Sequence, residues 1–234
     1  MPFSPNAKRY LRGVAVALIG VLVAVLGITA VGFFGDYFAA NPLQARLMLT
    51  GSLGIDILGA VVPVAVSFVA TVLFIKSVNA PLKKLILTLS VSVFAAFLLY
   101  HLTTEGIAGS PLLLTLVASA VAGAVTVFPK PLVGLKENFV AALMLTLTCV
   151  PLSIFAVDLY YSRFFACAVI GGNGLADGLL LSALYAPLAV TALFSVLTYV
   201  SQTVLLVSNI RSDNAKPSPK MHCPVLSKNS NSQT

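Results

Sequence analysis

Long apolar runs set the narrowest limits on how this chain can fold. Residues 14–34 contain no charged side chain, and apolar stretches of similar length recur through most of the sequence. The hydrocarbon core of a bilayer is about 30 Å thick, and an α-helix of roughly 20 apolar residues spans it. A transmembrane barrel would instead alternate apolar and polar residues with a period of two. Because the runs are continuous, they predict an all-α protein that crosses the membrane several times.

The scarcity of charge supports the same conclusion. Of the 234 residues, 59% are apolar and 9% are charged, whereas soluble domains carry about 25% charged residues. The net charge of +7 does not predict a nucleic-acid partner, because the basic residues lie at the ends of separate apolar runs and form no single patch. The predicted partner is the lipid bilayer, and the predicted localisation is the cell membrane, with multiple passes.

Six membrane spans are the expected number, and seven are the alternative. Five apolar runs match single helices: Val14–Phe34, Leu53–Ile75, Leu85–Leu102, Leu112–Phe128 and Phe139–Val157. The last region, Phe164–Ser208, is too long for one helix and slightly short for two. Its first part contains Gly171, Gly172, Asn173 and Gly174, which are poor helix formers. We therefore expect a re-entrant or broken glycine-rich element before a long final helix that is kinked near Pro187.

The positive-inside rule predicts the orientation of these spans. With six spans, twelve of the fourteen basic residues fall on one side of the membrane, and only Arg46 and Arg163 fall on the other. The twelve are Lys8, Arg9, Arg12, Lys76, Lys83, Lys84, Lys130, Lys136, Arg211, Lys216, Lys220 and Lys228. Both termini are thus expected in the cytoplasm. Residues 1–13 would form a basic N-terminus, residues 14–208 the transmembrane domain and residues 209–234 a disordered polar tail.

Three acidic residues near the outer ends of their segments are the candidate site residues. Asp158 follows the fifth run, Asp177 begins the final helix, and Asp56 lies a few residues inside the second run. A charge at the bilayer centre costs roughly 2.5 to 3.5 kcal/mol, so carboxylates at these positions require an explanation. The simplest explanation is that Asp177 caps its helix and that Asp158 lies in the headgroup region.

A functional explanation starts from the glycine-rich segment that precedes Asp177. Non-helical backbone at membrane depth survives only where it is buried in protein or lines a wet cavity. If residues 171–174 fold inward and bring Asp177 beside Asp158, the two carboxylates would face one polar pocket. Paired carboxylates can share a proton, so that one activates water while the other protonates a leaving group. Asp158 and Asp177 are therefore the candidate catalytic residues.

Three functions remain open on these residues. The first is a membrane-embedded aspartic-type peptidase that acts on a transmembrane peptide. The second is a transporter or channel-like protein that binds a proton, cation or small solute at its acidic residues. The third is a structural or assembly protein without a catalytic site. The candidate binding residues are Asp56, Gly171, Gly172, Asn173 and Gly174.

Three segments carry a resemblance to a known family: "IDILGAVVPVAVSF", "PLSIFAVDLYY" and "IGGNGLADGLLLSAL". They resemble a widespread prokaryotic family of polytopic membrane proteins that is defined only as a domain of unknown function, with a late Asp and a Gly-Gly-x-Gly-x-x-Asp-Gly motif. The resemblance covers about residues 50–190. The matching positions are Gly59, Ala60, Pro63, Asp158, Gly171, Gly172, Gly174, Asp177 and Gly178. The chain departs at Val157, where the family tends to have Ala, and at Asp56, where Asn is common. The resemblance implies a polytopic fold and no particular activity.

The order of Asp158 and Asp177 also resembles, more weakly, intramembrane aspartyl proteases of the presenilin and signal-peptide-peptidase type. Those proteins carry one Asp on one span and a second Asp in Gly-x-Gly-Asp on the next. The segment from Gly174 to Asp177 reads Gly-Leu-Ala-Asp instead, and neither a Pro-Ala-Leu element nor a Tyr before Asp158 is present. This resemblance implies shared chemistry and not membership of that family.

Motifs of other enzyme classes are missing from the sequence. It contains no GxxxxGK[ST] phosphate loop and no HExxH zinc motif, and His101 is the only histidine in the apolar body. The sequence predicts neither a strand before the "GGNG" segment nor the βαβ unit of a dinucleotide site. No metal and no cofactor are therefore predicted.

Overall fold

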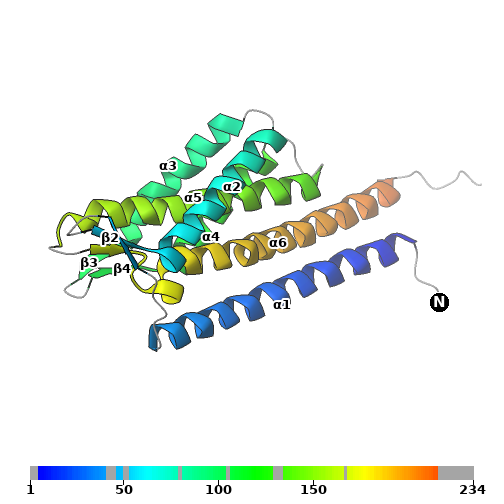
Figure 1. Ribbon diagram of the computed structural model, residues 1–234. Coiled ribbons are helices and arrows are strands. Elements are labelled where there is room, and N and C mark those ends of the chain that lie inside the picture. Colours follow the sequence, from blue (N-terminus) through cyan, green and yellow to red (C-terminus); the bar gives the residue numbers. More distant parts are fainter. Residues whose placement is uncertain are drawn as a thin grey trace, which may run out of the picture.

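The computed structural model describes residues 5–40, 46–49, 53–78, 81–103, 106–128, 134–165 and 168–215. Six α-helices dominate this part of the chain (Figure 1). They are α1 (Pro5–Ala40), α2 (Val62–Ser77), α3 (Pro81–Leu99), α4 (Pro111–Val127), α5 (Leu135–Ser162) and α6 (Gly178–Ala215). The short elements are β1 (Arg46–Met48), β2 (Leu53–Asp56), π-helix η1 (Ile57–Val61), β3 (His101–Thr103), β4 (Gly106–Ala108), β5 (Ala168–Ile170) and 3₁₀ helix η2 (Gly174–Ala176). The predicted all-α class is confirmed.

Five helical segments of the described chain are long and apolar enough to cross a bilayer: Tyr10–Ala40, Ile57–Ser77, Pro81–Leu99, Leu135–Ser162 and Gly178–Ser208. Helix α4 is also apolar but has only 17 residues. Leucine and valine side chains on the outer faces of these helices are widely exposed. Exposed apolar surface on this scale requires lipid as the surrounding solvent.

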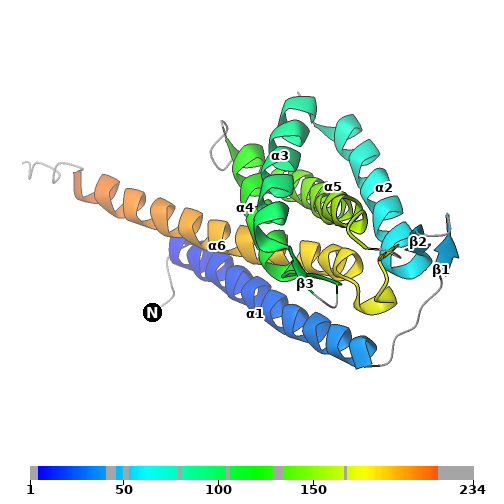
Figure 2. The same ribbon diagram turned by 90° about the vertical axis from the view of Figure 1, so that its left-hand side faces the viewer.

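Successive helices run in opposite directions. The N-terminal end of α1 and the C-terminal end of α6 therefore lie at the same end of the bundle, and the short strands lie at the other end (Figure 1). Helix α5 is central and contacts α2, α3, α4 and α6. The apolar window of α5 is 61% buried, against 11% for α1, which packs along α6 at the edge of the bundle (Figure 2).

Hydroxyl groups join α2 to α5 inside the bundle. The Ser67 hydroxyl donates to the carbonyl oxygens of Pro63 and Leu147, each at 2.9 Å. The Thr71 hydroxyl lies 3.2 Å from the Thr148 hydroxyl. Such pairs stabilise helix contacts in lipid, where the hydrophobic effect between helices is absent and each pair contributes about 0.6 to 2 kcal/mol.

The prediction is wrong at the start of the second span and at the end of the third, where the chain forms a strand and not a helix. Leu53–Asp56 forms β2, which pairs antiparallel with β1 and parallel with β5. Leu102 lies in β3, which pairs with β4. Apolar residues suit both strands and helices, so a short apolar stretch does not reveal which one forms. Pairing between segments distant in the sequence determines the outcome here.

The outer boundaries of the helical part also differ from the prediction. Helix α1 begins at Pro5 instead of Val14, and α6 continues to Ala215 beyond Ser208. The predicted disordered tail is therefore helical at residues 209–215. Its remaining part, residues 216–234, lies outside the described residues, as does Lys130.

Glycines allow α1 to approach α6 closely. Their contacts pair Gly13 with Gln202, Gly20 with Ser195 and Gly27 with Leu188. Both sets of residues repeat at intervals of seven, the spacing that keeps two helices in contact along a left-handed supercoil. Small residues at such positions bring the backbones together and increase van der Waals contact.

We expect Gly27→Leu to separate α1 from α6. A Cβ atom at Gly27 would already lie 2.5 Å from Leu188 Cδ2, and overpacking of this kind costs about 1 to 3 kcal/mol. The measurement is the thermal unfolding midpoint in detergent. Gly32→Leu is the matched control, because the nearest atom to a Cβ at Gly32 is Tyr185 Oη at 3.9 Å. Equal midpoints for the two variants would contradict the close packing of this seam.

Candidate functional site

A cavity of about 410 Å³ lies at the end of the bundle that carries the short strands. Its wall combines the last turns of α5, strands β4 and β5, and the glycine-rich turn that leads into α6. Asp158 and Asp177 both line this cavity. Two of the acidic residues singled out in the sequence therefore face a common space, although they belong to different elements.

Asp158 lies one helical turn before the end of α5. Its neighbour Val157 is fully buried in the core, whereas Asp158 is only partly buried and lines the cavity. The carboxyl groups of Asp158 and Asp177 interact electrostatically. Arg163, the next basic residue along the chain, stacks on Tyr160 with its guanidinium carbon 3.8 Å from the ring centre.

Asp177 lies between η2 and α6 and caps the latter helix. The backbone N–H of Leu179 donates to Asp177 Oδ1 at 2.9 Å, and the N–H of Leu181 donates to the Asp177 carbonyl oxygen at 2.9 Å. Burial raises the pKa of Asp177 to about 6. The backbone N–H groups of Leu179 and Asn173 act in the lowering direction on this pKa, and the carboxylate of Asp56 acts in the raising direction. The predicted capping role is thus present together with a position on the cavity wall.

Asp56 has a structural role at the start of the second membrane segment. Its side chain is fully buried and accepts from the backbone N–H groups of Leu58 at 2.9 Å and Gly59 at 2.8 Å. These bonds cap η1, whose first N–H groups have no partner within the helix. Asp56 is not among the described residues that line the cavity, but it is an electrostatic neighbour of Asp177.

The glycine-rich segment forms a tight turn that packs against η1. Gly171 and Gly174 have φ values of 72° and 56°, which favour glycine. The N–H of Gly174 donates to the carbonyl oxygen of Gly171 at 3.0 Å. A Cβ atom at Gly59 would overlap the Gly171 carbonyl oxygen and would lie 3.0 Å from Asp177 Cβ. The absence of a side chain at Gly59 thus lets the turn reach the position that places Asp177.

The predicted binding residues divide into two groups. Gly171, Gly172 and Asn173 line the cavity, whereas Gly174 is buried and is not among the described lining residues. The segment is a break before the helix, since β5, a turn and η2 precede α6. The prediction that no strand precedes Gly171 is wrong, because Ala168–Ile170 pairs with the distant strand β2. Among the described residues, no group of three or more His, Cys, Asp or Glu side chains is arranged to hold a metal ion.

Sequence reasoning did not single out Tyr100, which directly follows α3. Burial and the charges of Asp158 and Asp177 raise the pKa of its hydroxyl above the ordinary value. In the sequence, Tyr100 is a single aromatic residue at the end of an apolar run, which is also where interfacial tyrosines occur. Only its packing against α5 and the start of α6 distinguishes it from those residues.

The apolar helices and this cavity define the chain as an α-helical membrane protein with several candidate spans and two carboxyl groups in one cavity at the end of the bundle. Comparison with protein-family models, with curated proteins and with solved structures found no match. The resemblances drawn from sequence segments therefore stay predictions.

Proposed function

We propose that this chain is a membrane-embedded aspartic-type peptidase in which Asp158 and Asp177 form the catalytic pair. One observation carries the proposal: both carboxyl groups line the same 410 Å³ cavity and interact electrostatically. Two carboxyl groups that act on the same bond must face a common cavity, because both have to reach the reacting atoms. Carboxyl groups with only a structural role are under no such constraint.

The pair would hydrolyse a peptide bond by general acid–base catalysis. The charged carboxylate takes a proton from water as the water oxygen bonds to the carbonyl carbon, and the protonated carboxyl gives its proton to the carbonyl oxygen. In the second step the C–N bond breaks, the nitrogen receives the proton now held by the first carboxyl, and a hydroxyl of the tetrahedral intermediate returns its proton to the other carboxylate, which restores the singly protonated pair. The backbone donors at Asp177 favour its charged form, so we assign the water-activating role to Asp177.

Strand β5 supports a peptide as the substrate. Ala168, Val169 and Ile170 line the cavity. Within the described residues, β5 is one of the two outer strands of the sheet ordered β1-β2-β5. Outer strands bind extended peptides through main-chain hydrogen bonds. A peptide bound along β5 would carry its backbone past the two carboxyl groups.

We also propose six spans with both termini in the cytoplasm, α4 being a short sixth span. In support, Lys76, Lys83, Lys84 and Lys136 lie in the helix ends at the same end of the bundle as the N-terminal end of α1. The positive-inside rule assigns such an end to the cytoplasm. The cavity then opens toward the outer face of the membrane, and the glycine-rich turn is the re-entrant element.

One observation favours a transporter as the second candidate. Asp56 is buried beside Asp177, so three acids gather near one end of the bundle, as in sites that bind a proton or a cation. The bonds from Leu58 and Gly59 engage Asp56 in helix capping, which leaves Asp158 and Asp177 as the groups facing the cavity.

The test uses the full chain in proteoliposomes with a library of single-span transmembrane peptides, and cleavage is read by mass spectrometry. We expect Asp158→Asn and Asp177→Asn each to lower the cleavage rate at least about 100-fold, since acid–base groups contribute 10²- to 10⁴-fold. Asp36→Asn, an exposed acid on α1, is the matched control and should cleave as wild type. Unchanged cleavage in both cavity variants would exclude the pair. Proton or cation flux that depends on Asp56, without cleavage, would favour the transporter.

A further inference from the structure

Two buried side-chain oxygens in the described part of the chain have no hydrogen-bond partner, and one of them belongs to Tyr100. The other, Ser92 Oγ, lies within α3. Tyr100 is only 5% exposed. A buried hydroxyl without a partner costs about 1 to 3 kcal/mol, and such groups in folded proteins commonly have a function or a partner that binds later.

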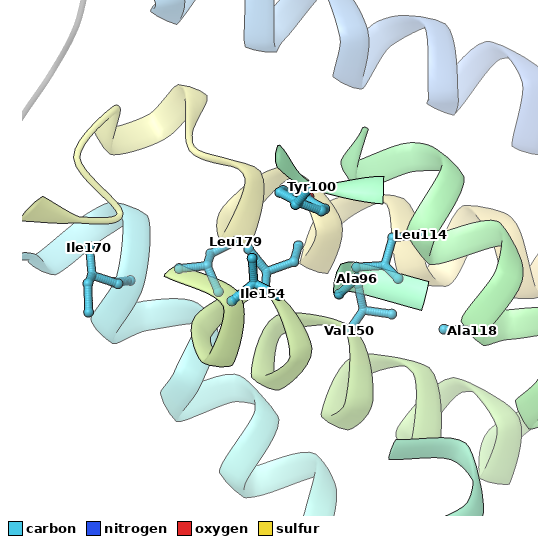
Figure 3. Close-up of a cluster of buried hydrophobic side chains, with 10 residues drawn as sticks. Ala96, Tyr100, Leu114, Ala118, Val150, Ile154, Ile170 and Leu179 are labelled. Carbon is cyan, nitrogen blue, oxygen red and sulfur yellow. The ribbon is translucent and has the colours of Figure 1, made fainter. Parts of the chain in front are cut away.

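The ring of Tyr100 is held firmly in the core. It belongs to a cluster with Ala96, Leu114, Ile154 and Leu179 (Figure 3). Its backbone N–H donates to the Ala96 carbonyl oxygen at 2.9 Å. A Cβ atom at Gly109 would overlap the ring, so the chain at Gly109 lies directly against it. Because the ring is fixed by this packing, the Tyr100 hydroxyl has one defined position.

The hydroxyl lies at the start of α6, next to Asp177. A Cβ atom at Gly178, the residue after Asp177, would lie 3.4 Å from Tyr100 Oη. The hydroxyl interacts electrostatically with both Asp158 and Asp177. Phenylalanine would fill the same space without an unpaired oxygen, so the packing alone does not explain a tyrosine here.

We infer that Tyr100 is a positioning residue of the carboxylate pair, whose hydroxyl donates a hydrogen bond to the member of the pair that becomes charged. The inference rests on the proposed pairing of Asp158 and Asp177. The donor would stabilise the negative charge on the pair and hold the charged oxygen toward the cavity. Among the described residues, Asp56 is a further titratable group that interacts electrostatically with the pair, through Asp177.

The experiment replaces Tyr100 by phenylalanine in the full chain in proteoliposomes. Loss of a donor to the charged form makes ionisation harder. We therefore expect the titration midpoint of the pair to rise by about one pH unit. The midpoint is followed by the infrared carboxylic-acid band that disappears in Asp158→Asn and Asp177→Asn. The acid limb of the pH–rate profile for the cleaved transmembrane peptide should move by the same amount, with kcat lowered about 10-fold or more and KM little changed.

Two controls separate this role from a packing role. Tyr185→Phe removes the hydroxyl of another buried tyrosine, on α6, and should leave the midpoint unchanged. 3-Fluorotyrosine at position 100 keeps the ring and strengthens the donor, so it should move the midpoint downward. A midpoint that is the same in wild type, Tyr100→Phe and the fluorinated protein would overturn the inference. Because the infrared readout needs no turnover, a shifted midpoint without peptide cleavage would uphold the role of Tyr100 and count against the peptidase.

Discussion

Gly59→Ala is expected to displace the glycine-rich turn and lower the free energy of unfolding by about 2 to 4 kcal/mol, in the range that overpacking of a rigid neighbour produces. The φ of Gly59 is not in the left-handed region, so the backbone accepts alanine. The cost is entirely steric. The new Cβ would overlap the Gly171 carbonyl oxygen and lie 2.8 Å from the Gly174 carbonyl oxygen. Both neighbours are backbone atoms, which cannot rotate away as a side chain does.

Thermal unfolding in detergent measures this effect. Gly178→Ala is the matched control, because a Cβ there makes only ordinary contacts, at 3.4 Å with Tyr100 Oη and 4.0 Å with Pro111 Cβ. The control should unfold at the wild-type temperature, while Gly59→Ala unfolds several degrees lower. Since the turn places Asp177, the same variant should also lose cleavage of the transmembrane peptides. Equal unfolding temperatures for the two alanine variants would contradict the contact between η1 and the turn.

Asp177→Asn is expected to stabilise the protein at pH 7 and to have little effect near pH 4. The folded state holds the Asp177 proton with a pKa of about 6, against an ordinary value of 3.8. The folded state therefore binds the proton more tightly than the unfolded state, and stability falls as the pH rises from about 4 to about 6. The difference corresponds to about 3 kcal/mol above pH 6. Asparagine removes the charge and retains an oxygen that accepts from the Leu179 N–H.

Unfolding midpoints of wild type and Asp177→Asn across pH 4 to 8 measure this prediction. Asp177→Ala is the second comparison, because it removes both the charge and the cap. Loss of an N-cap costs about 1 kcal/mol, so its gain at pH 7 should be smaller than that of asparagine. Parallel curves for wild type and Asp177→Asn over the whole range would show that burial imposes no cost on this carboxylate.

If Asp177→Asn gains stability and loses cleavage, the Asp177 carboxylate has a catalytic role and destabilises the fold. Asp56 offers the contrast, because its carboxylate accepts two backbone N–H bonds at 2.8 and 2.9 Å at the start of η1. The two aspartates look alike in the sequence, each near a glycine at the start of an apolar run. Their local hydrogen bonds and their positions relative to the cavity separate them.

The helical class and the approximate positions of the helices followed from the apolar runs. The run Leu112–Phe128 lies within one residue of α4 at both ends. Ser110 caps this helix and Pro111 occupies its first turn. The hypothesis that Asp158 and Asp177 converge also came from local signals: a glycine-rich break followed by an acid. These signals are strong because few backbone structures are stable in lipid and because glycine destabilises a helix.

The strands β2, β3 and β5, the capping role of Asp56 and the place of Tyr100 had no such local signal. Leu53–Ile55 pairs with residues 168–170, more than a hundred positions away, and no short stretch of either segment encodes its partner. Tyr100 lies near the two carboxyl groups because the end of α3 packs against α5 and the start of α6. Consecutive residues determine that the surrounding solvent is lipid and that most segments are helical. Which side chains of separate helices come together depends on how those helices pack.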